Sequence, residues 1–193
     1  MKTAIITIRG TSPLLMHNVR LANPLDEYVK RLKPITGKRK KTEEDYMEIA
    51  RLEWEGGMYY SKADGPMLPG RMIKACILRG ATKTKEGPSV RSGVAITADS
   101  NRIDYDGPRT LDEMWADGRF HDMRAIGVGQ SKTIRTRPVF PEWSVTFPVG
   151  YEENVVELES VHRFLRTAGM MVGIGDYRPE KNGDFGRFEL VES

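Results

Sequence analysis

A glycine-rich segment of the chain combines residue types that could bind phosphate. Its members are four glycines and two arginines: Gly173, Gly175, Gly183, Gly186, Arg178 and Arg187. Glycines let backbone N–H groups approach an anion closely, and guanidinium groups form charge-assisted hydrogen bonds with phosphate oxygens. The segment is therefore a candidate phosphate-binding loop, although an ordinary connection between a helix and a strand can have the same composition.

Basic residues are concentrated in particular segments of the chain. The net charge is only +3, but residues 30–41 carry seven basic and no acidic residues, among them Lys38, Arg39 and Lys40. Residues 119–137 carry five lysines and arginines against one aspartate. We expect residues 30–41 to form a mobile loop whose charges repel one another. Such a loop either stays solvated or contacts phosphate.

The other side chains with useful chemistry do not form a recognisable metal or cofactor site. Cys76 is the single cysteine, so no intrachain disulfide can form and no zinc ligand set is available. His17, His121 and His162 are far apart in the sequence. The glycine-rich segment follows a helical pattern and lacks the lysine of a P-loop. We therefore expect no metal and no cofactor.

The sequence contains no signal for membrane insertion or export. No run of about 18 apolar residues occurs, and the first residues have the pattern of a strand rather than of a signal peptide. A single cysteine fits a reducing compartment. We expect a cytoplasmic protein with no membrane partner.

Hydrophobic spacing and turn residues predict the order of helices and strands. β-branched residues predict a first strand, and apolar residues at helical spacing predict three helices, one of which Thr42 can cap. The last helix has Asn154 as its expected N-cap and Gly169 as its expected C-cap. The expected elements are a strand at 3–9, helices at 42–54 and 69–80, strands within 92–103 and 134–149, a helix at 154–168 and a strand at 185–191.

This order of elements indicates an α+β fold. It is compatible with a ferredoxin-like or RRM-type βαββαβ core, in which two helices cover one face of an antiparallel sheet. We expect a single domain at 1–193 with large insertions at about 18–41 and 82–137. The exposed face of such a sheet is a common platform for single-stranded nucleic acid.

Two motifs resemble the signatures of the RAMP superfamily, and of its Cas7-like branch in particular. The first is LPGRMIKACILRGA at Leu68–Ala81, where a Pro-Gly step opens a helix that ends in an arginine-glycine pair. The second is GIGDYRPEKNGDFGRFELV at Gly173–Val191, where a glycine-rich loop joins the next helix to the last strand. Proteins of that family build the backbones of CRISPR effector complexes.

The resemblance implies sequence-independent binding of single-stranded RNA by subunits that stack into a filament. The implied partners are RNA, further copies of this chain and, in a CRISPR system, other effector-complex subunits; a stand-alone or virus-borne relative is an equal possibility. The two insertions would supply palm-like and thumb-like surfaces. The residues expected to contact RNA are Lys38, Arg39, Lys40, Arg71, Lys74, Arg135, Arg137, Gly173, Gly175, Arg178 and Arg187.

Two alternative functions remain open at this point. One is a structural or interaction protein of the same fold that binds no nucleic acid, such as a virion component or a decoy subunit. The other is an endoribonuclease. In some Cas7-like proteins an aspartate in the loop after the first strand cuts RNA, and Asp26 is the candidate here. The spacing of the other residues indicates no acid–base pair, so we expect no further catalytic residue.

Overall fold

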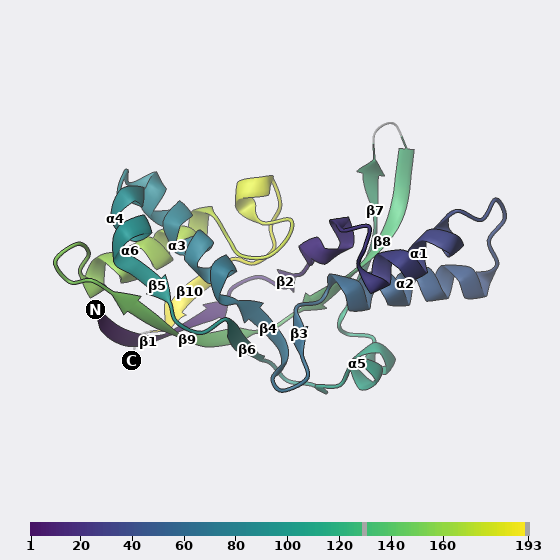
Figure 1. Ribbon diagram of the computed structural model, residues 1–193, viewed down its shortest axis with the longest axis horizontal. Helices are drawn as coiled ribbons and strands as arrows, with labels where there is room; N and C mark the ends of the chain where they lie inside the picture. The colour runs from purple at the N-terminus through teal and green to yellow at the C-terminus, as the bar shows by residue number, and fades with distance from the viewer. Residues whose placement is uncertain (129–130, 192–193) are drawn as a thin grey trace. The chain divides into compact units, whose positions relative to one another are not determined.

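A computed structural model describes residues 1–128 and 131–191, which fold as two compact units (Figure 1). Unit 1 comprises Met1–Leu14, Tyr60–Asp106 and Phe140–Ser193, and unit 2 comprises Leu15–Tyr59 and Gly107–Val139. Unit 2 is built from two segments that interrupt unit 1 in the sequence. The expectation of one domain with insertions stays a prediction.

Unit 1 consists of an antiparallel sheet and several helices. Its elements are β1 (Lys2–Gly10), β3 (Tyr60–Ser61), β4 (Gly65–Pro69), α3 (Gly70–Lys83), α4 (Gly87–Gly93), β5 (Val94–Ile96), β6 (Ser100–Asp104), β9 (Ser144–Tyr151), α6 (Leu158–Met171), the 3-10 helix η2 (Pro179–Lys181) and β10 (Phe188–Val191). The strand order is β10-β1-β9-β6-β4-β3, and β5 also pairs with β9.

The core of unit 1 lies between this sheet and two helices. Alternation along β1 buries Ile6 and Ile8 and leaves Ile5 68% exposed on the other face. Val145 and Phe147 of β9 are buried in the same alternating way. Helices α3 and α6 pack against each other, and α6 also packs on β10 (Figure 1). The apolar face of the sheet is therefore covered by helices.

The predicted α+β fold class is confirmed. In chain order, β1, α3, β6, β9, α6 and β10 follow the βαββαβ pattern, and their strands lie side by side in the order β10-β1-β9-β6. The predicted insertions at about 18–41 and 82–137 both overlap unit 2, whose first segment continues to Tyr59. Helix α4 and strands β5 and β6 belong to unit 1.

The last helix begins and ends at residues other than those predicted. Its N-cap is Glu157 rather than Asn154. Gly169 lies inside the helix, where a side chain would collide with the Phe188 carbonyl group. The chain turns away at Gly173, whose φ of +71° is a conformation that glycine adopts without steric cost. Gly169 therefore allows close packing of α6 on β10, and Gly173 follows the end of the helix.

Unit 2 contains helices on a three-stranded sheet. Its elements are β2 (Leu14–Leu15), where the first segment begins, the 3-10 helix η1 (Val19–Ala22), α1 (Glu27–Thr36), α2 (Glu43–Gly57), α5 (Leu111–Asp117), β7 (His121–Val128) and β8 (Ser131–Phe140). The strand order is β2-β8-β7. Trp54 of α2 is fully buried, and its indole N–H donates to the Phe120 carbonyl at 2.8 Å. This bond joins the two segments of the unit.

The expectation of a mobile loop at residues 30–41 is wrong for its first half. Asp26 caps α1, which continues through Pro34 to Thr36. Ile35 is buried, and α1 packs along α2. Packing of the apolar side of α1 therefore outweighs the charge repulsion from which the loop was predicted.

Candidate nucleic-acid interface

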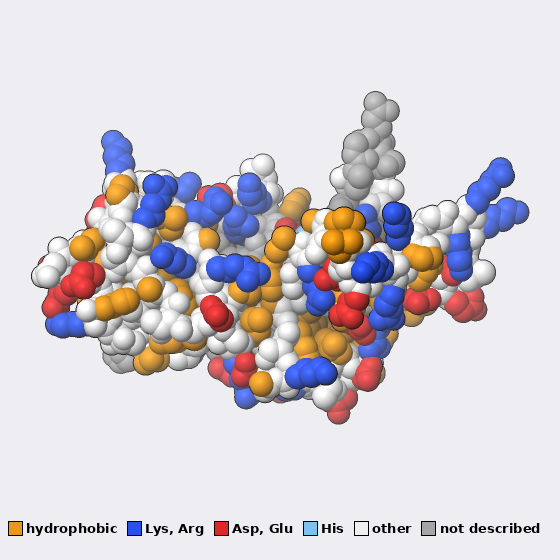
Figure 2. Space-filling view, viewed as in Figure 1, with side chains coloured by type: hydrophobic (Ala, Val, Ile, Leu, Met, Phe, Trp, Pro, Cys, Tyr) orange, Lys and Arg blue, Asp and Glu red, His pale blue; other side chains and the backbone are white. Residues whose placement is uncertain are grey.

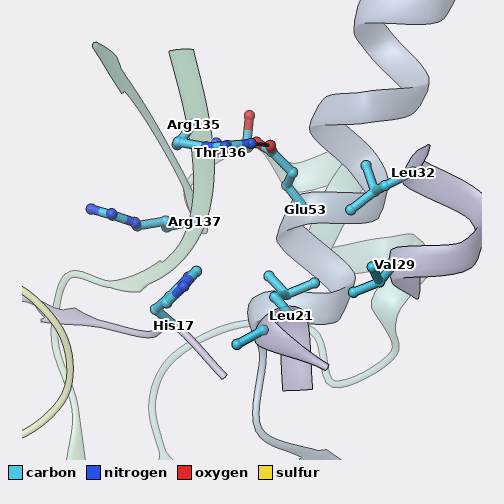
Figure 3. Close-up of a pocket in the computed structure, with 9 residues that line it drawn as sticks. His17, Leu21, Val29, Leu32, Glu53, Arg135, Thr136 and Arg137 are labelled. Atoms are coloured by element: carbon cyan, nitrogen blue, oxygen red, sulfur yellow. Dashed lines mark hydrogen bonds and ion pairs between the residues drawn. The ribbon is translucent and has the colours of Figure 1, made fainter. Parts of the chain in front are cut away.

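Unit 2 contains a cavity of about 340 Å³ with one apolar wall and one polar wall (Figure 3). Helices η1 and α1 supply the apolar side, and α2 and β8 supply most of the polar side. The lining residues are His17, Leu21, Ala22, Val29, Leu32, Glu53, Arg135, Thr136 and Arg137. A volume of this size lies at the lower end of the range for small-molecule sites.

The amphipathic pattern of α1 creates the apolar wall. Val29 and Leu32 are three residues apart, which places them on one face of the helix. Leu21 of η1 lies near them in Figure 3. All three side chains are partly buried, while the basic residues Lys30 and Arg31 of the same helix are exposed.

Glu53 is a buried carboxylate in the polar wall, only 5% exposed. Its Oε1 accepts a bond from Arg135, and its Oε2 accepts a bond from the Thr136 backbone N–H at 3.1 Å. Helical spacing places Glu53 on the buried face of α2 with Ala50 and Gly57. A buried carboxylate is costly unless a cation compensates it. Arg135 is therefore held in place by an internal partner.

Alternation along β8 supplies the second cation of the cavity. Arg135 and Arg137 are two residues apart, so they project from the same face of the strand. They stand opposite Arg124 and Asp122 of β7, which bond to each other with an Nε–oxygen distance of 2.6 Å. The Arg137 side chain points away from Glu53 in Figure 3. The structure thus brings together two of the residues that were expected to contact RNA.

Two lining residues, His17 and Glu53, were missed by the sequence analysis. Glu53 did carry a signal, because a carboxylate at helical spacing from Ala50 and Gly57 indicates a buried acid that needs a partner. His17 carried no such signal. It follows β2 in the chain, and no local pattern relates it to the distant strand β8.

The connection from α1 to α2 presents another group of basic residues. Lys38 forms a 2.6 Å ion pair with Asp45, and this bond lowers the pKa of Asp45. Lys41 donates to the Lys38 carbonyl at 2.9 Å. Arg39 and Lys40 are exposed, and Figure 2 shows basic side chains at this connection. Of the three residues predicted here, Arg39 and Lys40 face solvent and Lys38 is bound to α2.

Unit 1 places Arg71 and Lys74 on one helix. They are three residues apart on α3, so they share a face. Arg71 is exposed and Lys74 is partly exposed. Figure 2 shows basic side chains over α3. These two predicted residues therefore lie together on the surface of α3.

The glycine-rich loop of unit 1 folds closely upon itself. A side chain at Gly183 or Gly186 would collide with carbonyl groups of the same loop. The N–H groups of Gly173, Gly183 and Gly186 donate to carbonyl oxygens of unit 1 at distances between 2.8 and 3.1 Å. Gly175 lines a smaller cavity of about 130 Å³. These three N–H groups are already used within unit 1, so the glycines serve the packing of the loop itself.

The two arginines of this loop also bond within unit 1. Arg178 donates to the Gly175 carbonyl and to Glu180, both at 3.0 Å, and Arg79 of α3 reaches the same carboxylate at 2.8 Å. Burial acts to raise the pKa of Glu180, but the bonds from Arg79 and Arg178 outweigh it and lower the pKa. Arg187 donates to a carbonyl group of α6. Contact of these loop residues with RNA remains a prediction from the resemblance.

Asp26 caps a helix in this structure. Its Oδ1 accepts the Tyr28 backbone N–H at 3.0 Å, and its Oδ2 accepts a bond from the Nε of Arg20 at 2.9 Å. Both oxygens are therefore engaged in holding the start of α1. This geometry gives no support to a role for Asp26 in RNA cleavage.

In residues 1–128 and 131–191, no group of three or more His, Cys, Asp or Glu side chains is arranged to hold a metal ion. No helix in this part of the chain has the length and apolar character needed to cross a membrane.

His121 should make the stability of the protein depend on pH. Its ring packs against Trp54 and Trp115, and burial, assisted by Arg51, lowers the pKa of His121 below its usual value of 6.5. The unfolded chain therefore binds more protons between the lowered pKa and 6.5, so stability should decrease as the pH falls below about 6.5. Urea denaturation between about pH 7 and pH 5.5 should show this decrease, and a His121→Phe variant should show a smaller one. Equal slopes for the two proteins would contradict the assignment.

The chain was also compared with known proteins. No model of a protein family matches the sequence, and a search of curated protein sequences finds no match. The resemblance to the RAMP superfamily therefore rests on the two motifs at Leu68–Ala81 and Gly173–Val191.

Proposed function

We propose that this protein binds single-stranded RNA through the sugar-phosphate backbone, largely independently of sequence, and that unit 2 carries the interface. The supporting observation is the cavity in which the cationic strand β8 faces the apolar wall of α1. Proteins that bind single strands combine cations for the phosphates with apolar or aromatic surface for the bases. The unit 2 cavity provides both kinds of surface within one site.

The distribution of charge also supports an interface in unit 2. Unit 2 contains 15 lysines and arginines against 12 aspartates and glutamates, whereas unit 1 contains 15 of each. The whole net charge of +3 therefore comes from unit 2. Arg39, Lys40 and Arg137 are the basic residues that we assign to phosphate contacts. A surplus of positive charge attracts a polyanion and speeds its association.

The proposal extends to assembly of several copies along one strand. The resemblance to Cas7-like proteins is one support for it. The β7–β8 hairpin is another, because its Met123 and Ile134 side chains are 52% and 61% exposed. Exposed apolar side chains that lie together are typical of surfaces that contact other proteins. We assign this activity to the cytoplasm because the single cysteine fits a reducing compartment.

Replacing Arg39 and Lys40 by alanine should weaken RNA binding and reduce its salt dependence. The double variant removes two charges that neutralise phosphates and release counterions. The slope of log affinity against log salt concentration should therefore decrease by about one to two. Filter binding to a uridine homopolymer at about 50 and 200 mM salt measures this slope.

A matched control separates an interface from a general effect of charge. Lys62 and Lys83 are exposed residues of unit 1, and replacing both by alanine changes the net charge by the same amount. This control variant should show the same slope of log affinity against log salt concentration as the unaltered protein. Equal losses in both double variants would contradict an interface in unit 2. Failure of the unaltered protein to bind RNA at low salt would exclude the proposed function.

An interaction protein that binds no nucleic acid is the second candidate. The observation that favours it is the glycine-rich loop, where Gly173, Gly186 and Arg178 bond within unit 1. A virion component or a decoy subunit would use such a closely packed loop to contact protein. The same titration, together with the oligomeric state of the RNA-free protein, distinguishes the two functions. Assembly without RNA and no retention of RNA at low salt would support this second candidate.

A further inference from the structure

We propose that the unit 2 cavity binds one guanine base, whose N1–H and amino group donate hydrogen bonds to Glu53. The base can come from a nucleotide of the bound strand that has turned out of its stack, or from a free guanine nucleotide, since both present the same edge. The inference adds a preference for one base to the proposed function. It rests on that function only for the strand-bound case.

Glu53 has acceptor capacity left after its internal bonds. An ionised carboxylate has about four lone-pair positions. Arg135 uses one on Oε1, and the Thr136 N–H uses one on Oε2. Counting the bonds from the described residues, one acceptor position therefore remains on each oxygen, and Glu53 lines the cavity. A ligand that satisfies both positions must offer two donors side by side.

Guanine is the base that offers two adjacent donors. Its N1–H and its exocyclic amino group lie next to each other and match a carboxylate in a bidentate arrangement. On the same edge, adenine and cytosine each offer one amino group, and uracil offers one N–H. Bonds to a buried charged group are stronger than neutral bonds. The carboxylate of Glu53 therefore selects guanine over the other three bases.

The other walls of the cavity fit the rest of the nucleotide. Leu21, Val29 and Leu32 form an apolar surface for the flat face of the base (Figure 3). Contact with this surface keeps water away from the polar bonds and strengthens them. Arg137 lines the same cavity and points away from Glu53 in Figure 3. The phosphate of the nucleotide therefore lies toward Arg137, at the opposite end from the guanine edge.

The test compares oligonucleotides that differ in one base. The probes are a labelled uridine oligomer, the same oligomer with one central guanine, and the same oligomer with one central adenine, together with guanosine and adenosine monophosphate. Fluorescence anisotropy with the full chain should show about tenfold tighter binding of the guanine oligomer than of the adenine oligomer. Calorimetry should show binding of guanosine monophosphate in preference to adenosine monophosphate.

Two variants locate the preference in the cavity. Glu53→Gln replaces one acceptor oxygen with a donor, so the ratio of guanine to adenine affinity should decrease to about one. Val29→Trp fills the cavity from its apolar wall without altering Glu53, and it should also reduce the ratio of guanine to adenine affinity to about one. This second variant tests the inference even if Glu53→Gln fails to fold. Lys30→Trp places the same bulk on an exposed position of α1. This matched control should keep the tenfold ratio.

Each outcome decides at least one of the two proposals. Binding of the uridine oligomer with no gain from guanine would overturn the inference and leave the proposed function standing. Binding of guanosine monophosphate alone would overturn the proposed function and leave the cavity as a site for a free nucleotide. A guanine preference that survives Val29→Trp would overturn its assignment to this cavity. Binding of no probe would overturn both.

Discussion

Replacing Gly186 by alanine should reduce the free energy of unfolding of unit 1 by at least about 3 kcal/mol. Gly186 has a φ of +68°, a backbone conformation that costs an alanine about 1–2 kcal/mol. An added Cβ would also collide with the Ile174 carbonyl group. That collision would break two bonds that hold the loop. The Ile174 N–H donates to the Gly186 carbonyl at 2.9 Å, and the Gly186 N–H donates to the Pro13 carbonyl at 2.8 Å.

Gly118 offers a matched control for this substitution. Its φ is +81°, and an added Cβ would have no neighbouring atom within 4 Å. Gly118→Ala therefore carries only the conformational cost, about 1–2 kcal/mol. Urea denaturation followed by circular dichroism measures both variants. If both variants lost the same free energy of unfolding, the close packing around Gly186 would contribute nothing to the stability of unit 1.

Trp54→Ala should reduce the free energy of unfolding of unit 2 by about 3–5 kcal/mol. The side chain is fully buried and packs with Trp115 and His121 at centroid distances of 5.3 Å. Its N–H bond to the Phe120 carbonyl crosses between the two segments of the unit. Truncation would leave a large cavity and remove one bond to the Phe120 carbonyl, which would still accept the Val139 N–H at 3.0 Å. Urea denaturation measures the loss.

The Trp54→Phe variant separates packing from hydrogen bonding at this position. Phenylalanine keeps most of the apolar contact and loses the N–H donor, so the loss should be about 1–3 kcal/mol. A larger loss for phenylalanine than for alanine would contradict the packing argument. Hydrogen exchange of the β7 and β8 amides gives an independent measure, since these strands should lose protection when Trp54 is truncated.

Elements with strong local signals were predicted correctly from the sequence. The cap of α2 at Thr42 and the start of α3 after Pro69 depend on a few neighbouring residues. Two local features that depend on distant contacts were predicted wrongly. Gly169 remains helical because β10 packs closely against it, and the basic segment at 27–36 is helical because Ile35 is buried. Local propensity is a weak guide wherever tertiary packing outweighs it.

The candidate site was predictable only in part. Arg135 and Arg137 could be named because they lie in the basic segment at 119–137. His17 and Glu53 could not be related to them, because the chain separates them by many residues. The cavity depends on how β8 lies against α2, and that arrangement follows from the core around Trp54 rather than from any motif.

The α+β class, the order of the core elements and the segments that carry the positive charge were all predictable from the amino-acid pattern. These properties follow from periodicity and composition, which are local. The folded chain was needed to show that Glu53 holds Arg135, Asp45 holds Lys38 and Glu180 holds Arg178. An ion pair depends on the distance and burial of two side chains in the folded chain, and composition does not contain that information.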